Sequence, residues 1–432
     1  MNSVLNDWET RKLKFVATCN DDALSETTDP EFEMEYVDIS SVNLVEGVAA
    51  TETVTFDKAP SRARRIVQDG DTIISTVRTY LKAIASIQSP PANMVVSTGF
   101  AVIRPTDAID GGFLGYALQN TAFIELVVAN STGVSYPAIN PSLLTSLPIA
   151  FPRSLATQKQ IAAFLDWKTS QIDALIAKKQ TLLQKLKEKR LAVITQAVTK
   201  GLNPDAPMRD SGIAWLGKVP AHWGVKRLKF VAHVGNGSTP NREDSAYWDG
   251  GTYPWLNSSV VNQEQVTNAD QFVTPLALSE CHLPRISPPA VLVGITGQGK
   301  TRGMATTLLF EATINQHLAY VKPDEAKASV GFLRRVFDMA YAHLRIESEN
   351  GGSTKGAITC EQIAELPIPV PPLDEQVVIS ERIDMALAKL ARMSDNAKSA
   401  ITRLTEYRSA LITAATTGKI DVRGWQAPQE TV

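Results

Sequence analysis

The chain has 432 residues, which exceeds one ordinary hydrophobic core and predicts two or three domains. Its 43 Lys and Arg residues against 45 Asp and Glu give a net charge of −2 at pH 7, which argues against a protein that coats nucleic acid indiscriminately but allows local basic surfaces. Three widely spaced cysteines, Cys19, Cys281 and Cys360, predict neither a disulfide framework nor a zinc site, and no apolar run is long enough to span a bilayer, so a cytoplasmic protein is expected.

The chain opens on a short basic and apolar element that recurs later. Trp8–Ala17 reads WETRKLKFVA, and Trp223–Ala232 reads WGVKRLKFVA. Further matched segments follow in the same order: Ser40–Val42 with Ser258–Val260, Phe100–Pro105 with Leu318–Pro323, and Leu147–Ile149 with Leu366–Ile368. Because order and spacing are kept, we interpret the whole chain as a tandem duplication of a unit of about 215 residues, far longer than a solenoid repeat.

Each copy then has the same internal plan. Short β-rich runs, such as Asp71–Val77 and Ala290–Thr296, are separated by turns. An amphipathic helix is predicted over 113–128 and over 332–346, followed by a Gly/Ser/Thr loop at 131–136 or 351–356. A proline-punctuated strand, SLPIAFP or ELPIPVPP, comes next. Each copy is therefore predicted to be an α/β globule of about 150 residues that precedes a long helix.

The helix that closes the first copy is the strongest element of the sequence. Thr157–Thr199 contains no Pro or Gly, Thr157 stands where an N-cap is expected, and Gly201 follows the end. At 1.5 Å per residue it is roughly 60 Å long. Lysines interrupt its apolar heptad seam at Lys168, Lys179 and Lys189, and the apolar seam positions are Ile161, Leu165, Ile172, Leu175, Leu182, Leu186 and Val193.

A second long helix supplies a partner for the first. Ile379 follows Ile161 by 218 positions, and a heptad series begins there whose apolar members include Ile379, Ile383, Leu390, Met393, Leu404 and Leu411. Two units related by a pseudo-two-fold axis set these helices antiparallel, so we expect a coiled coil with one globule at each end. Small residues such as Ala397 facing Lys179 would then fix the register.

These patterns predict the following domains. Residues 1–152 form a first globular domain, 153–202 a long helix, 203–222 a Pro- and Gly-rich linker without periodicity, 223–371 a second globular domain, 372–420 a second long helix and 421–432 a tail. The fold class is α/β (α+β), with two similar globular domains joined by an antiparallel coiled coil.

One segment matches a nucleotide-binding pattern. Gly294–Thr301 satisfies the phosphate-loop pattern G-x-x-x-x-G-K-[ST] and follows a strand-like run. A true phosphate loop requires a helix to begin at Lys300-Thr301, whereas the residues that follow include Gly303 and β-branched residues that favour another strand. The corresponding loop of the first copy, 76–82, contains no glycine. We interpret the match as a Gly-rich β-turn, and keep a P-loop ATPase as an alternative hypothesis.

Catalytic patterns are not found elsewhere in the sequence: no paired carboxylates, Ser/His/Asp set, metal-spaced histidines or methyltransferase motifs stand out.

Two related globules joined by long helices suit a linear, periodic ligand, and duplex DNA is the obvious candidate. Corresponding loops carry groups able to read bases or hold phosphates, although an ordinary solvated loop residue is at least as good an interpretation of each. These DNA-binding candidates are Arg78, Tyr80, Lys82 and Tyr136 in the first copy and Gln298, Lys300, Arg302 and Lys355 in the second. Because the scaffolds match and the loops differ, an asymmetric, bipartite target is expected.

The order of these motifs resembles a known family. Two variable globules, each closed by LPI-x-x-P and a long helix, with the linker segment Ser211–Trp223 (SGIAWLGKVPAHW), resemble the specificity subunit of type I restriction-modification systems. The lead SG-x-x-WLG-x-x-P-x-HW is missing before the first copy.

The resemblance implies that the globules are target recognition domains, each binding one half of a split double-stranded DNA site. It further implies that the helices act as a spacer and dock two modification (methyltransferase) subunits, with restriction (endonuclease and translocase) subunits completing the assembly. The chain itself is then non-catalytic and holds no cofactor or metal, because S-adenosylmethionine, ATP and magnesium belong to the partner subunits.

Two questions stay open at the level of sequence. The basic face of the first helix, residues 178–200, suits either DNA or an acidic surface on a methyltransferase subunit, with the second weakly favoured. The alternative function of a different class is a coiled-coil adaptor whose globules bind proteins instead of DNA.

Overall fold

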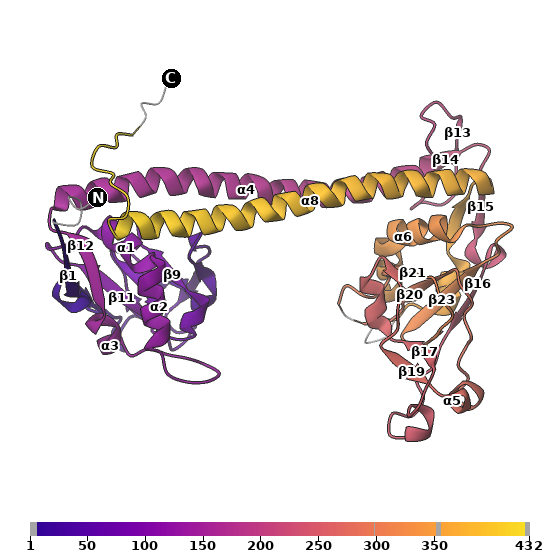
Figure 1. The fold of residues 1–432 in the computed structure, drawn as a ribbon, viewed down its shortest axis with the longest axis horizontal. Coiled ribbons are helices and arrows are strands. Elements are labelled where there is room, and N and C mark those ends of the chain that lie inside the picture. Colours follow the sequence, from indigo (N-terminus) through magenta and orange to yellow (C-terminus); the bar gives the residue numbers. More distant parts are fainter. Residues whose placement is uncertain (1–6, 298, 351–355, 428–432) are drawn as a thin grey trace. The chain divides into compact units, whose positions relative to one another are not determined.

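The computed structural model describes residues 7–297, 299–350 and 356–427. The chain divides into two compact units: unit 1 comprises residues 1–182 with 397–432, and unit 2 comprises residues 183–396. Each unit has a globular part with sheets and short helices, and each includes part of both long helices, α4 (Leu155–Lys200) and α8 (Leu373–Thr416) (Figure 1). Each unit is therefore built from both halves of the duplicated sequence.

The globular part of unit 1 contains two four-stranded sheets. One has the strand order β6-β3-β10-β7 and the other β2-β11-β8-β9, while β1 pairs with β12 and β4 with β5. The strands are β1 Trp8–Lys12, β2 Ala17–Cys19, β3 Glu33–Val37, β4 Val42–Asn43, β5 Gly47–Val48, β6 Glu52–Thr55, β7 Ala63–Ile66, β8 Thr72–Ser75, β9 Ile84–Ser86, β10 Met94–Ser97, β11 Phe100–Pro105 and β12 Pro148–Pro152. The helices are α1 Gly111–Gln119, α2 Thr121–Ala129 and α3 Pro141–Ser146, with 3-10 turns η2 Leu13–Phe15, η3 Ile39–Ser41 and η4 Thr79–Leu81.

The globular part of unit 2 repeats this plan. Its five-stranded sheet has the order β16-β23-β20-β21-β18, its three-stranded sheet β19-β17-β22, and β15 pairs with β24. The strands are β15 Gly224–Arg227, β16 Ala232–Asn236, β17 Tyr253–Leu256, β18 Gln265–Val266, β19 Gln271–Val273, β20 Ala290–Gly294, β21 Ala305–Leu308, β22 Thr313–Ile314, β23 Leu318–Pro323 and β24 Pro367–Val370. The helices are α5 Pro275–Glu280, α6 Val330–Asn350 and α7 Cys360–Glu365, with 3-10 turns η5 Leu228–Phe230, η6 Ser245–Tyr247 and η7 Ser258–Asn262.

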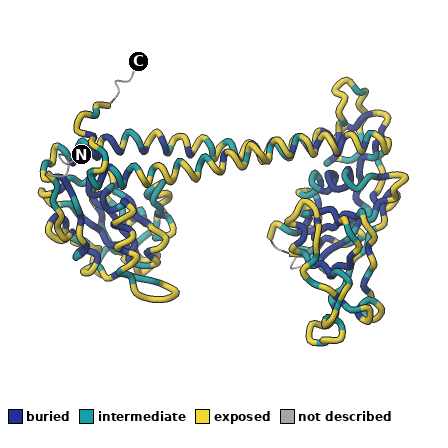
Figure 2. The backbone as a smooth tube through the Cα atoms, viewed as in Figure 1, coloured by how far each residue is buried: buried dark blue, intermediate teal, exposed yellow. Residues whose placement is uncertain are grey.

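The predicted duplication is confirmed by strand order as well as by sequence. The order β2-β11-β8-β9 in unit 1 corresponds to β16-β23-β20-β21 in unit 2, and the parallel pair β3-β10 corresponds to the parallel pair β17-β22. In both units an apolar core lies between the sheet and the helices, including the long ones, as the dark segments of Figure 2 show. The same alternation of apolar residues thus buries the same faces twice.

The predicted helix over 113–128 is wrong in one respect, because it is two helices. Asn120 ends α1 in an extended conformation, and its side-chain oxygen accepts a hydrogen bond from the backbone N–H of Phe123 at 2.8 Å, so it caps α2. Across the described residues no single helix has the length and apolar character of a membrane span; α1 and α2, bent by 62° at their break, satisfy that test only as a pair.

The long helices run antiparallel within each unit, as predicted. In unit 1 the first part of α4 shares a core with the end of α8, and Asp173 pairs with Arg408 at 3.0 Å. In unit 2 the end of α4 shares a core with the first part of α8. The start of α4 differs from the prediction, because Ser154 and not Thr157 occupies the capping position: the Ser154 hydroxyl accepts from the Thr157 N–H at 3.4 Å.

The buried face of these helices follows the predicted heptad seam only in part. Leu175 is 46% exposed and Met393 is 40% exposed, so neither lies in the seam. Neighbouring residues are buried where the heptad count drifts, because a helix turns every 3.6 residues and a seven-residue repeat falls behind by about 20° per heptad. Of the predicted positions, Ile161, Leu165, Ile172, Leu186, Ile379 and Ile383 are buried and Leu182, Val193, Leu390, Leu404 and Leu411 are half-buried; Ile176, Ile194, Leu387 and Ile412 are buried in addition.

The predicted linker and tail are folded where the structure describes them. Strands β13 (Met208–Asp210) and β14 (Lys218–Pro220) form a hairpin, and Trp215 stacks on His343 of α6 at 4.7 Å between ring centroids. In the tail, Trp425 contacts the rings of Phe164 and Trp167 of α4. Periodicity of the sequence does not predict these contacts, because single aromatic residues make them.

Candidate nucleic-acid interface

The turn between β8 and β9 presents three of the DNA-binding candidates. Arg78 and Lys82 flank η4, and both have left-handed backbones, with φ of 50° and 54°. A non-glycine residue seldom adopts this conformation, and such strain persists only where surrounding contacts enforce it. Thr79 provides one such contact, because its buried hydroxyl lies 2.8 Å from the hydroxyl of Ser131 in the next loop. The turn is therefore held in a fixed shape while Arg78, Tyr80 and Lys82 remain exposed.

The loop after α2 lies against this turn and adds the fourth candidate. A β-bridge joins Val77 to Ala138, and the Arg78 guanidinium lies 4.7 Å from the centroid of the Tyr136 ring. Tyr136 is 65% exposed, and Val134 near the tip of the loop is fully exposed. We call Arg78, Tyr80, Lys82, Val134 and Tyr136 the unit 1 loop patch. It combines cations for phosphates with flat and apolar groups for base edges, the mixture that base readout uses.

In unit 2 the corresponding loop, between β20 and β21, is held by α6. The Tyr341 hydroxyl donates to the Lys300 carbonyl at 2.9 Å, and Arg345 donates to the Gly299 carbonyl at 2.6 Å. Lys300 is exposed, whereas Arg302 is only 4% exposed and pairs with Glu349 at 2.7 Å. The prediction that Arg302 contacts DNA is therefore corrected, because its guanidinium fastens the loop to α6. Gln298 and Lys355 lie outside the described residues.

The phosphate-loop match in this segment has the structure expected of a β-turn. Strand β21 follows the loop and pairs antiparallel with β20, with Val293 opposite Ala305. No helix begins at Lys300-Thr301 in the described part of this loop, so the helix N-terminus that binds phosphate in a true phosphate loop is missing there. Nor do the described residues include a group of three or more His, Cys, Asp or Glu side chains placed to hold a metal ion.

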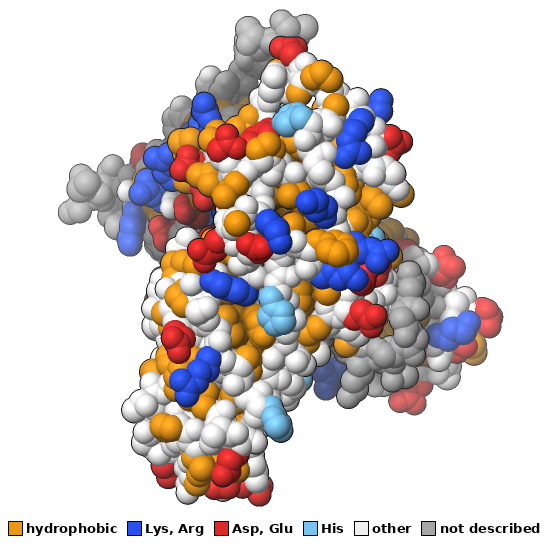
Figure 3. Space-filling view, turned by 90° about the vertical axis from the view of Figure 1, so that its right-hand side faces the viewer, with side chains coloured by type: hydrophobic (Ala, Val, Ile, Leu, Met, Phe, Trp, Pro, Cys, Tyr) orange, Lys and Arg blue, Asp and Glu red, His pale blue; other side chains and the backbone are white. Residues whose placement is uncertain are grey.

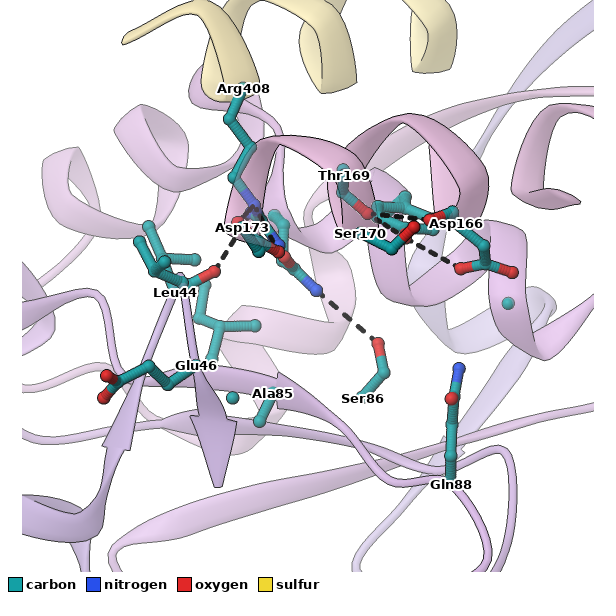
Figure 4. Close-up of a pocket in the computed structure, with 16 residues that line it drawn as sticks. Leu44, Glu46, Ala85, Ser86, Gln88, Asp166, Thr169, Ser170, Asp173 and Arg408 are labelled. Atoms are coloured by element: carbon teal, nitrogen blue, oxygen red, sulfur yellow. Dashed lines mark hydrogen bonds and ion pairs between the residues drawn. The ribbon is translucent and has the colours of Figure 1, made fainter. Parts of the chain in front are cut away.

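Unit 1 also contains a polar cavity of about 490 Å³ where its globular part meets the long helices (Figure 4). Arg408 of α8 reaches across it, donating to Asp173 at 3.0 Å and to the carbonyl of Leu44 at 3.1 Å. The Tyr116 hydroxyl donates to Asp166 of α4 at 2.7 Å, and burial raises the pKa of Tyr116. Three carboxylates, those of Glu46, Asp166 and Asp173, line the cavity against the single cation of Arg408.

Unit 2 has a cavity of about 600 Å³ at the corresponding place. Arg190 of α4 takes the position of Arg408, since the two are 218 positions apart, the offset that also relates Ile161 to Ile379. Here the charge is inverted: Lys187, Arg190, Lys300 and Arg334 line the cavity against Glu264 and Asp338. Burial raises the pKa of Glu264, but Arg335 and Arg334 outweigh burial and hold that pKa below its usual value. Glu264 is therefore ionised at neutral pH and bridges three arginines, Arg190, Arg334 and Arg335.

Sequence reasoning missed both cavities. Their walls come from four or five separated segments, and only the shared offset of Arg190 and Arg408 gave a signal. The duplication thus preserved the position of the cavity and changed its charge. Equivalent places in the two units offer different chemistry, at the cavities as well as at the loops.

Two segments of the chain match one family model, the type I restriction modification DNA specificity domain, at residues 6–188 and 220–402. The specificity subunit of the type I restriction enzyme EcoKI of Escherichia coli strain K12 is 23% identical over 337 residues, which cover 76% of this chain and 69% of that protein.

Solved structures share the fold. One is a chain from a structure that describes the complex assembly and conformational transition of the type I R-M system. It has a TM-score of 0.74 at 21% identity, and the match covers 96% of this chain and 98% of that one. The HsdS subunit from Thermoanaerobacter tengcongensis has a TM-score of 0.53 at 21% identity, covering 96% of this chain and 97% of that one.

Proposed function

We propose that this chain, which belongs to the type I restriction modification DNA specificity family, is the subunit that selects the DNA target of a type I restriction-modification complex. Each globular part binds one half of an asymmetric, bipartite site in duplex DNA. The observation that carries the proposal is the duplicated scaffold with different loops: the unit 1 loop patch is aromatic and basic, whereas the corresponding loop of unit 2 is Gly-rich with Lys300 exposed. Different side chains on one scaffold suit different half-sites.

The chain acts without catalysing a reaction itself. We propose that it assembles two modification subunits and the restriction subunits around the target, and that S-adenosylmethionine, ATP and magnesium bind to those partners. The complex then operates in the cytoplasm, where the DNA is. The long helices, which each contribute to both units, serve in this proposal as the spacer between the two half-sites.

Methylation mapping of the host genome tests the proposal. A strain that carries the complete three-gene system should show methylation at a two-part asymmetric motif, and deleting the gene for this chain should abolish it. Exchange of residues 8–150 for the first globular part of a relative should change one half of the motif and leave the other half unchanged. A motif that persists after the deletion contradicts the proposal.

Binding to labelled duplexes separates this function from that of a protein-binding adaptor. Duplexes with and without the mapped motif are compared at several salt concentrations, with the modification subunits present. A sequence-specific reader retains a preference of about 10³-fold or more for the motif, whereas an adaptor shows no preference at any salt concentration.

A further inference from the structure

The basic and apolar element that opens each copy has the same conformation in both units. Lys12 and Arg227, which precede η2 and η5, have φ/ψ of −68°/139° and −67°/142°. Leu13 and Leu228 are fully buried, and their N–H groups donate to Leu147 and Leu366 carbonyls at 2.9 Å in both units. The two elements are therefore anchored to the globular parts in the same way.

An exposed phenylalanine ends each element. Phe15 is 62% exposed and Phe230 is 58% exposed. In each unit the preceding lysine lies over the ring, with Lys14 Nζ 5.4 Å and Lys229 Nζ 5.5 Å from the ring centroids. We call Phe15 with Lys12 and Lys14, and Phe230 with the corresponding Arg227 and Lys229, the two phenylalanine knobs. Figure 3 shows one face of unit 2, on which basic, acidic and hydrophobic side chains are intermingled.

Burial does not explain why both copies keep this aromatic residue. The fold uses the leucine as the anchor, and a large apolar side chain in water contributes little to stability. The loops proposed to read DNA have diverged between the units, yet this exposed site has kept its residue types and its geometry. A surface that is the same in both units suits a ligand of which each unit binds one copy through the same contacts.

We infer that the phenylalanine knobs are two equivalent docking sites for two copies of one protein partner, whose surface offers an apolar recess bordered by carboxylates. This inference rests on the proposed function, in which that partner is the modification subunit. A duplex DNA backbone is also the same at every site, but it offers phosphates without an apolar recess, and a phenylalanine reaches base faces only by unstacking them. An aromatic anchor with a basic border is the composition of a protein hot spot.

The two knobs differ in which basic residue is paired with a carboxylate. In unit 2, Glu365 pairs with Lys229 and with Arg227. In unit 1 the corresponding residue, before Leu147, is Ser146, and Lys14 has no ion pair with any carboxylate that the structure describes. Lys14 is therefore uncompensated where Lys229 is paired, whereas the carboxylate of unit 1, Glu9, pairs with Arg11 at 3.0 Å and has no counterpart at Gly224.

The test uses the full chain and the modification subunit of the same system. At a concentration a few-fold above the wild-type Kd, native mass spectrometry of the mixture should show mainly two modification subunits per wild-type chain, mainly one for Phe15→Ala or Phe230→Ala, and mainly none for the double variant. Each lost site should bind about 30-fold more weakly, the effect of truncating a hot-spot aromatic. Phe272→Ala, which truncates an exposed phenylalanine of β19 that belongs to neither knob, is the matched control and should retain two.

A thermal melt of each variant shows whether the chain is still folded, and Lys14→Glu combined with Lys229→Glu provides a second test that leaves both rings in place and should also weaken binding. If the double phenylalanine variant still binds two modification subunits with wild-type affinity, the inference is overturned while the proposed function stands. If it binds two subunits but loses sequence-specific DNA binding, the knobs belong to the DNA interface and the inference is overturned. If the wild-type chain binds no modification subunit, both fail.

Discussion

A single buried glutamine joins each long helix to its globular part. Gln158 donates to the Pro152 carbonyl at 2.7 Å and accepts from the Asp110 N–H at 2.7 Å. Gln376 repeats this arrangement with the Pro371 carbonyl at 2.9 Å and the Ser329 N–H at 2.9 Å. Each amide thus satisfies backbone groups at the strand before the long helix and at the start of α1 or α6, which otherwise remain buried without partners.

Replacing this glutamine should destabilise the unit that contains it. Gln158→Ala leaves a buried N–H and a buried carbonyl without partners, at a cost of about 2 kcal/mol. We expect a clear decrease in the melting temperature of unit 1, measured by calorimetry or by circular dichroism. Gln184→Ala, at an exposed position of the same helix, is the control and should melt as the wild type does. Equal melting temperatures for Gln158→Ala and Gln184→Ala would show that the hydrogen bonds of the Gln158 amide contribute nothing to stability.

Side chains of this kind limit what the sequence predicts at single positions. Gln158 and Gln376 look like ordinary polar helix residues, and only the distant backbone groups they meet give them a role. Arg302 shows the opposite case, because a basic residue in a Gly-rich turn looks available for phosphate until Glu349 of α6 is found beside it. Arg78, Tyr80, Lys82 and Tyr136 do gather at one surface, although whether they contact DNA remains a prediction.

At the scale of elements, length and repetition were the reliable signals. The two long helices, the strands β8 and β20, and the strands β12 and β24 lie where the sequence predicts them, because each has a long or repeated pattern. The break at Asn120, the hairpin β13–β14 and the packed tail were missed, since each depends on one or two residues. The helix seam was predicted correctly near its ends and drifted between them, where Ile176 replaces Leu175.

The drift can be tested by a pair of adjacent substitutions. Ile176→Ala removes a side chain that is 4% exposed and should cost about 2–4 kcal/mol, whereas Leu175→Ala removes one that is 46% exposed and should cost less than about 1 kcal/mol. Denaturant or thermal unfolding of the two variants measures the difference. A strict heptad seam places Leu175 in the core and Ile176 outside it. A larger loss of stability for Leu175→Ala than for Ile176→Ala would therefore support the strict heptad seam.

At the scale of the whole molecule, one scaffold is used twice with different chemistry. The sheets, the buried glutamines and the phenylalanine knobs are alike in both units, while the loops and the charges of the cavities differ. The duplication was visible in the sequence because it preserves whole segments. The inversion of cavity charge was not, because it requires knowing which segments meet.

The spacer role of the long helices predicts a change in the DNA target. Deleting Lys179–Lys185 together with Met393–Ser399 removes one heptad from each helix, about 10 Å of rise. We expect the gap between the two halves of the methylated motif to shorten by about three base pairs, with both halves unchanged. Methylation mapping reads out the gap. An unchanged gap would show that the helices do not set it.

Unit 1 is formed from two separate stretches of the chain, and this affects the order in which the two units can fold during synthesis. Unit 2 is one continuous stretch, residues 183–396, but unit 1 needs residues 397–432 in addition to 1–182. Ile412, Ala415 and Val422 complete the same core as Leu13 and Phe113. On the ribosome, unit 2 can therefore close while the earlier-made unit 1 still waits for its last helix. The N-terminal half of the chain is made first and finished last, because its core lacks Ile412, Ala415 and Val422 until the end of the chain has been made.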